Sequence, residues 1–167
     1  MLAFLRKFYK EYEIIALREK NLDVLFEFCA KNAFYYEISN EILSKEKLQK
    51  DLKALPQGAR FEDKFYLGFF KETKLCVVLE FILHYPDENT AMLGFFMLAK
   101  ELQGQNHGSE FLQNFFQILQ QKGFQECVLS FHKDNLQARN FWLKNGFLIE
   151  ANEEEFEDLV SMEKKLG

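Results

Sequence analysis

A glycine-containing segment, "ELQGQNHGSEF" (Glu101 to Phe111), holds the residues best suited to binding a charged ligand. Gly104 and Gly108 allow the backbone to curl close to a bound group, and Asn106 is the non-glycine residue that best tolerates a positive φ. The apolar stripe that follows predicts a helix, whose first N–H groups have no partner inside the helix. The pattern favours phosphate binding. The simpler alternative is that Gly108 and Ser109 only begin the helix.

The second candidate is Glu80, the only charge between Lys74 and Asp87. Carboxylates are rarely buried without a partner or a purpose. In a regular strand Glu80 shares a face with Val78 and Ile82. At the centre of a sheet it is then partly buried with a raised pKa, or it faces a cleft. The alternative is an outward-facing glutamate on a half-solvated strand.

The histidines and one tyrosine are weaker candidates. His84 and Tyr85 follow the same strand and are the next groups that could move a proton, although each also fits a surface position at a strand end. His107 and His132 could contact a phosphate or water in a cleft. Three scattered histidines do not make a metal site, so we expect no metal.

Two segments together, "QGQNHGS" (Gln103 to Ser109) and "NLQARNFWLKNGF" (Asn135 to Phe147), resemble the signature of the GNAT superfamily of N-acetyltransferases. That signature reads Q/R-x-x-G-x-G/A and then N-x-x-A-x-x-F-Y-x-x-x-G-F. Two motifs in the right order are far more specific than either one alone. The resemblance covers essentially the whole chain and implies an α/β fold, with a central, mostly antiparallel sheet flanked by helices. It also implies acetyl-CoA as the cosubstrate.

The resemblance further implies how acetyl-CoA would be held. The backbones of Phe96, Met97 and Leu98 would hydrogen-bond the pantetheine arm, and Asn135 would meet that arm near the fifth strand. The pyrophosphate would lie in a loop made of Gln103, Gly104, Gln105, Asn106, His107, Gly108 and Ser109.

Two positions depart from the family pattern. Asn106 replaces the first glycine of the loop, a change that its tolerance of positive φ permits. Trp142 replaces the tyrosine that often reprotonates the leaving thiolate, and an indole N–H is not an acid at neutral pH. We therefore expect Trp142 to pack against the cofactor arm, and the proton to come from another group or from water.

The implied reaction is direct transfer of the acetyl group to an amine. An alkylammonium with a pKa of about 10.4 leaves only about one part per thousand as free amine near pH 7.4, a handicap of roughly 4 kcal/mol. A carboxylate such as Glu80 that binds the cation and takes its proton through a water molecule meets that need. No Ser, Cys and His arrangement suggests an acyl-enzyme, and Cys76 and Cys127 lie in apolar runs that disfavour a thiolate.

Hydrophobic periodicity predicts the elements that position these residues, in the order β, α, α, β, β, β, α, β, α, β, β. The predicted strands are 11–17, 64–70, 74–85, 91–98 and 126–131, with two short strands closing the chain. The predicted helices are 21–38, one capped by Ser44 that runs to about Leu55, 108–122 and 135–144. The short breaks "KET" and "PDENT" suit an antiparallel meander. We expect a single mixed α/β domain over residues 1–167.

Composition supports a globular protein and excludes several functions. Of the 167 residues, 48% are hydrophobic and 28% charged, and no apolar run approaches the roughly 18–20 residues that a membrane span needs. The N-terminal order of apolar and charged residues is the reverse of a signal peptide's, so we expect a cytoplasmic protein without a membrane partner. Cys29, Cys76 and Cys127 suggest neither disulfides nor a metal cluster. The net charge of −5 argues against nucleic acid and favours a cationic small substrate.

The function expected from the sequence is therefore transfer of an acetyl group from acetyl-CoA to a primary amine, with a small molecule as the favoured acceptor. Two alternatives stay open. One is a module that binds acyl-CoA without turning it over, which the missing tyrosine favours. The other is acetylation of a protein lysine or N-terminus, for which a wide cleft is expected. Whether the 20 phenylalanines serve a dense core of a monomer or a homodimer surface also stays open.

Overall fold

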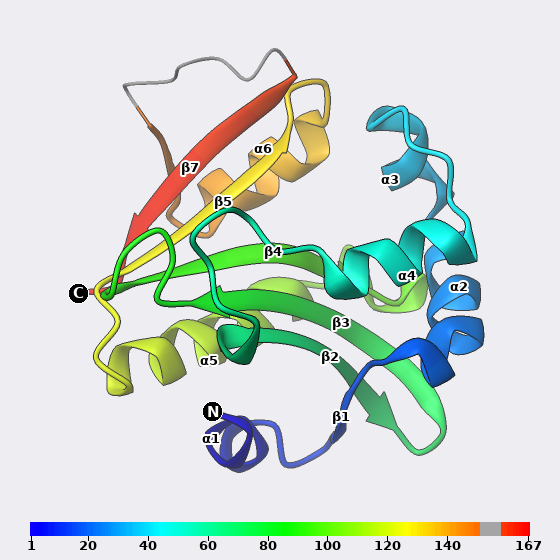
Figure 1. Cartoon of the computed structure of the whole chain (residues 1–167), viewed down its shortest axis with the longest axis horizontal. Coiled ribbons are helices and arrows are strands. Elements are labelled where there is room, and N and C mark those ends of the chain that lie inside the picture. The colour runs from blue at the N-terminus through cyan, green and yellow to red at the C-terminus, as the bar shows by residue number, and fades with distance from the viewer. Residues whose placement is uncertain (151–157) are drawn as a thin grey trace.

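The computed structural model describes residues 1–150 and 158–167, and its centre is a seven-stranded sheet (Figure 1). The strand order is β1-β2-β3-β4-β5-β7-β6. The strands are β1 (Glu13–Ala16), β2 (Lys64–Lys71), β3 (Lys74–Leu83), β4 (Thr90–Leu98), β5 (Glu126–His132), β6 (Leu148–Ile149) and β7 (Leu159–Lys165). The helices are α1 (Leu2–Phe8), α2 (Leu22–Ala30), α3 (Ala33–Ile38), α4 (Lys45–Lys53), α5 (His107–Gln121) and α6 (Leu136–Lys144). None of these described helices is both long and apolar enough to cross a membrane.

The sheet is mixed and mostly antiparallel, as the sequence predicts. Strands β2, β3 and β4 form the expected meander, and β4 pairs with β5 in parallel, with α5 as the connection. Apolar side chains on one face of the sheet pack against α1, α5 and α6. Those on the other face pack against α2, α3 and α4. The sheet is thus covered on both faces, which explains the continuous apolar runs of its central strands.

Two helical predictions need correction. The predicted order begins with a strand and lacks α1, whose Leu5 is fully buried in the core. The helix predicted over 21–38 is two helices, because Lys31 and Asn32 are not helical and separate α2 from α3. There the Asn32 side-chain amide donates to the Phe28 carbonyl at 3.1 Å, a local bond that competes with helix continuation. The predicted Ser44 cap is confirmed, since its hydroxyl accepts from the Lys47 N–H at 3.0 Å.

The feature that positions the site is the divergence of β4 from β5. Their pairing starts at Thr90 and Glu126 and ends at Leu93 and Leu129, so the second half of β4 has no partner on that side within the described sheet. In Figure 1, β5 and α6 turn away from β4 toward α3. At the same point the register between β3 and β4 shifts, which leaves Gly94 as an extra residue, a β-bulge.

Candidate active site

A cleft of about 1210 Å³ opens where β4 and β5 diverge. Its walls come from the α2–α3 junction, the second half of β4, the segment before α5, the end of β5, and α6. Most of the cofactor-binding residues predicted from the sequence line this one cleft: Phe96, Met97, Leu98, Gln103, Gly104, Asn106, Gly108, Ser109, Asn135 and Trp142. The structure thus brings together two motifs that are separate in the sequence.

The backbone of β4 faces β3 and the cleft in alternation. The Ala99 N–H donates to the Cys76 carbonyl of β3 at 2.7 Å. In an antiparallel ladder every second residue makes such bonds, so the peptide groups of Met97 also face β3. Those of Phe96 and Leu98 point the other way, toward the cleft. Phe96 and Leu98 therefore offer backbone hydrogen bonds to an extended ligand lying along β4.

The loop before α5 has the backbone shape that the sequence predicts. Gly104 has a φ of +77°, and Asn106 has a φ of +67° as the residue that caps α5. A Cβ at Gly108 would come within 3.2 Å of the Leu98 and Phe141 side chains. The first turn of α5 is therefore held tightly against β4 and α6, with its N–H groups at the end of the cleft, a favourable arrangement for a phosphate.

Two residues of the predicted loop, Gln105 and His107, have exposed side chains that do not line the cleft. The Gln105 amide donates to the Glu101 carbonyl at 3.2 Å. Any contact of these two residues with a phosphate therefore falls to their backbone N–H groups. Gln103 instead reaches across the cleft, because its amide donates to the Asn32 side chain at 2.7 Å. No feature of the local sequence indicates that contact.

Three lysines that are not among the predicted site residues line the cleft: Lys31, Lys100 and Lys144. Lys144 donates to the Asn106 side-chain oxygen at 2.9 Å, which places an ammonium group beside the loop. Positive charge around a helix N-terminus favours an anionic ligand. Lys144 lies within the second motif and could have been proposed from the sequence, whereas Lys31 and Lys100 resemble any other surface lysine.

Asn135 and Trp142, the two predicted site residues of the second motif, line the cleft and are both buried. Asn135 caps α6, because its Oδ1 accepts from the Ala138 N–H at 2.9 Å, and its Nδ2 makes no hydrogen bond within residues 1–150 and 158–167. Trp142 packs against Phe96 and Phe147, with ring centroids 6.2 and 5.4 Å apart. It offers the cleft an apolar surface.

Glu80 lies on the sheet face that α2, α3 and α4 cover, and its side chain is 14% exposed. Its Oε1 is 3.1 Å from the Nζ of Lys64, whose side chain is 3% exposed. A Cβ at Gly94 would come within 3.0 Å of the Glu80 carboxylate. Burial raises the pKa of Glu80, and the Lys64 ammonium opposes that rise.

A side cavity of about 160 Å³ adjoins the cleft and contains Glu80. It shares Tyr35, Glu41, Gly94 and Phe95 with the cleft. Its lining is Tyr35, Tyr36, Glu41, Lys47, Asp51, Ala54, Tyr66, Glu80, Gly94 and Phe95. Glu80 thus borders the cleft through the Gly94 bulge.

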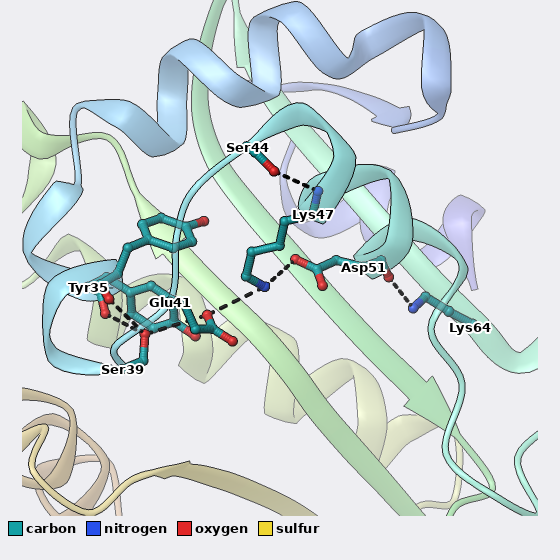
Figure 2. Close-up of polar contacts among 8 residues, drawn as sticks. Tyr35, Ser39, Glu41, Ser44, Lys47, Asp51 and Lys64 are labelled. Carbon is teal, nitrogen blue, oxygen red and sulfur yellow. Dashed lines mark hydrogen bonds and ion pairs between the residues drawn. The ribbon is translucent and has the colours of Figure 1, made fainter.

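The polar wall of the side cavity is a chain of charged groups (Figure 2). The Lys47 ammonium lies 3.4 Å from the Glu41 carboxylate and 2.9 Å from that of Asp51. The Lys64 ammonium donates to the backbone carbonyls of Asp51, at 2.8 Å, and Ala54. Lys64 therefore joins the end of α4 to Glu80.

The remaining candidates fall in different places. His84 and Tyr85 follow β3 at the end far from the cofactor loop and line neither cavity. The His84 ring nitrogen lies 2.8 Å from the Glu88 carbonyl. His132, at the end of β5, lines the cleft, and its side chain is 17% exposed.

Solved structures share this fold. The chain has 26% identity to PaiA N-acetyltransferase from Thermoplasma acidophilum in complex with coenzyme A, with a TM-score of 0.65 over 92% of this chain and 98% of that one. It has 19% identity to an acetyltransferase from Thermus thermophilus (TM-score 0.74; 92% and 96% covered). It has 12% identity to the ribosomal-protein-S18-alanine N-acetyltransferase from Escherichia coli (TM-score 0.63; 93% and 94% covered).

The sequence matches no curated protein. The model of the acetyltransferase (GNAT) family matches residues 32–147, a range that includes Glu80, the loop before α5 and the whole of α6. This range covers well over half of the chain. The chain therefore belongs to the GNAT family of acetyltransferases.

Proposed function

We propose that the chain transfers the acetyl group of acetyl-CoA to the primary amine of a small molecule. The observation that carries this proposal is the cleft between β4 and β5, which holds nearly all the predicted cofactor residues along one path. The bound coenzyme A of the similar Thermoplasma protein supports the same cofactor class.

The residues present fit acetyl-CoA. The segment 103–109 and the first turn of α5 suit the pyrophosphate, with Lys144 adding positive charge. The peptide groups of Phe96 and Leu98 suit the amide-containing pantetheine arm, and the Nδ2 of Asn135 can donate to it. Acetyl-CoA supplies an acetyl group activated as a thioester.

Glu80 handles the proton of the amine in this proposal. Its ionised carboxylate attracts the ammonium form of the acceptor to the Gly94 bulge and accepts a proton from it, directly or through water. The neutral amine then forms its bond to the acetyl carbon as the C–S bond breaks. The new amide nitrogen then loses its extra proton, which passes to the released thiolate through water or a cleft group such as His132, and Glu80 returns its own proton to solvent.

The test is an assay of coenzyme A release with acetyl-CoA and a panel of acceptors. The panel holds short alkylamines, peptides with free N-termini, and a lysine derivative blocked at both its α-amino and carboxyl groups. We expect acetylated alkylamine, identified by mass spectrometry, in an amount equal to that of the coenzyme A released. Exclusive use of the peptides or of the blocked lysine would replace the small-molecule proposal with a protein substrate. Tight binding of acetyl-CoA without any amine-dependent release would indicate a non-catalytic module.

A further inference from the structure

Tyr66 is nine-tenths buried, yet its hydroxyl has no hydrogen-bond partner among residues 1–150 and 158–167. In that part of the chain, every fully shielded side-chain oxygen or nitrogen does have a partner. The Tyr66 hydroxyl must therefore open onto the space that Tyr66 lines, which is the side cavity. A buried phenol that lacks a protein partner is normally satisfied by water or by a ligand.

The side cavity also carries an excess of negative charge. Among the described residues around it, the carboxylates of Glu41, Asp51 and Glu80 face the ammonium groups of Lys47 and Lys64. Glu80 is paired with Lys64, whereas Glu41 and Asp51 share the single ammonium of Lys47, so one negative charge is left on the Glu41 and Asp51 side of the cavity when all are ionised. A carboxylate accepts up to about four hydrogen bonds, so Lys47 does not exhaust its two acidic partners. The cavity therefore favours one further cation.

The walls favour a slim aliphatic chain. Tyr66, Glu80 and Phe95 lie in one row across β2, β3 and β4, because Glu80 pairs with Tyr66 on one side and with Phe95 on the other. The Tyr35 ring stands edge-on to Phe95, with centroids 5.5 Å apart. Aromatic faces attract both methylene groups and cations. The volume of about 160 Å³ equals that of roughly five water molecules.

We propose that the side cavity binds the far end of the acceptor, which is a short, unbranched primary amine carrying a second ammonium group. This inference rests on the proposed function. The reacting nitrogen lies at the Gly94 bulge beside Glu80, where the two cavities meet. The methylene chain extends into the side cavity, and the second ammonium donates to the Tyr66 hydroxyl and to the carboxylate of Glu41 or Asp51.

The orientation follows from the reaction. The reacting nitrogen must reach the cleft, so only the rest of the acceptor can fill the side cavity. A peptide N-terminus is branched next to its nitrogen and is followed by an amide and the rest of the peptide, so it fits this small acidic space poorly. An alkylamine with an apolar end fits the space, but it offers no charge to the carboxylates of Glu41 and Asp51 and leaves the buried Tyr66 hydroxyl without a partner, which is costly for a buried group.

The experiment compares 1,4-diaminobutane with n-pentylamine, in which a methyl group replaces the second ammonium. We expect the wild type to prefer the diamine by about tenfold or more in kcat/KM, the effect of one hydrogen bond to a charged group. Tyr66→Phe and Glu41→Gln should each reduce that preference. The matched controls are Tyr12→Phe and Glu37→Gln, and both should keep the preference. Tyr12 packs against the core on the other face of the sheet, and Glu37 is an exposed residue of α3 that lines neither cavity.

Calorimetry with 1,4-diaminobutane and the protein saturated with coenzyme A separates this inference from the proposed function. Diamine binding that Tyr66→Phe weakens supports the side-cavity assignment even if no amine is acetylated, an outcome that would refute the proposed function instead. Equal use of the two amines by the wild type would overturn the assignment while leaving the acetyltransferase activity intact. A diamine preference that Tyr66→Phe leaves unchanged would overturn it as well.

Discussion

The Glu80 carboxylate of β3 lies directly against Gly94, the extra residue of the bulge in β4. The contact is possible because glycine has no Cβ at a point where one would come within 3.0 Å of the carboxylate. Glu80 thereby reaches the junction of the cleft and the side cavity, although the residues before and after it in β3 are buried. The bulge at Gly94 therefore makes the space that the Glu80 carboxylate occupies.

The first prediction is that Gly94→Ala lowers kcat by tenfold or more while the affinity for coenzyme A stays constant. The new methyl group displaces the carboxylate, and a shift of about 1 Å at a reacting centre can reduce the rate on the order of a hundredfold. Steady-state kinetics and calorimetry measure the two quantities. If the effect acts through Glu80, the double variant Gly94→Ala with Glu80→Gln is no slower than Glu80→Gln alone. Additive losses would contradict that coupling.

The second prediction concerns Lys64, whose ammonium lowers the pKa of Glu80 against the effect of burial. In Lys64→Met this opposition is lost and the pKa of Glu80 rises further. Glu80 must be ionised to accept a proton, so the acid limb of the pH dependence of kcat/KM should move to higher pH. Lys64→Arg keeps the charge and serves as the control. An unmoved limb in Lys64→Met would show that the two groups do not interact as described.

The same change should lower stability in a pH-dependent way, which is the third prediction. A carboxyl whose folded-state pKa is raised contributes stability that is fully present below its unfolded-state pKa and is lost as pH rises through the folded-state pKa. Lys64→Met also removes the hydrogen bonds to the Asp51 and Ala54 carbonyls at every pH, so the difference from wild type should be smallest in acid and grow toward neutral pH. It should reach about 3–5 kcal/mol there, since an unpaired carboxylate is left buried. Urea unfolding at both pH values checks this, and adding Glu80→Gln should restore part of the loss.

The fourth prediction is that Asn106→Asp weakens coenzyme A binding by about fivefold or more. Aspartate also tolerates the positive φ at this position, so the change adds a negative charge next to the pyrophosphate with little backbone strain. Gln121→Glu adds the same charge at the other end of α5, about 20 Å away, and should leave the affinity unchanged. Equal affinity in Asn106→Asp and the control, measured by calorimetry, would place the phosphates elsewhere.

Local patterns in the sequence were sufficient for several features of the site. The loop before α5 was predicted because glycine and asparagine mark positive φ directly, and Asn106 does adopt it. Glu80 is a charge in an apolar run, a pattern that predicts burial with a raised pKa, and it is partly buried with a raised pKa in the structure. These features depend on the conformational and solvation preferences of single residues.

The partners of those residues could not be predicted, because they meet only in the folded chain. Lys64 begins β2 and looks like an ordinary strand-end lysine in the sequence, yet it is buried between α4 and Glu80. The unpartnered hydroxyl of Tyr66 and the bulge at Gly94 depend on strand register, and continuous apolar runs do not specify the register. The break at Asn32 has no proline or glycine to mark it in the sequence, because a side-chain hydrogen bond accompanies it.

The most direct test of the proposed mechanism is the pH dependence of amine acetylation by the wild type and by Glu80→Gln, with an acceptor taken from the amine panel. Glutamine keeps the shape and removes the base, so we expect a lower rate that falls furthest at low pH, where deprotonation of the amine is hardest. The affinity for coenzyme A should stay constant. Superimposable profiles with equal rates would contradict the role of Glu80.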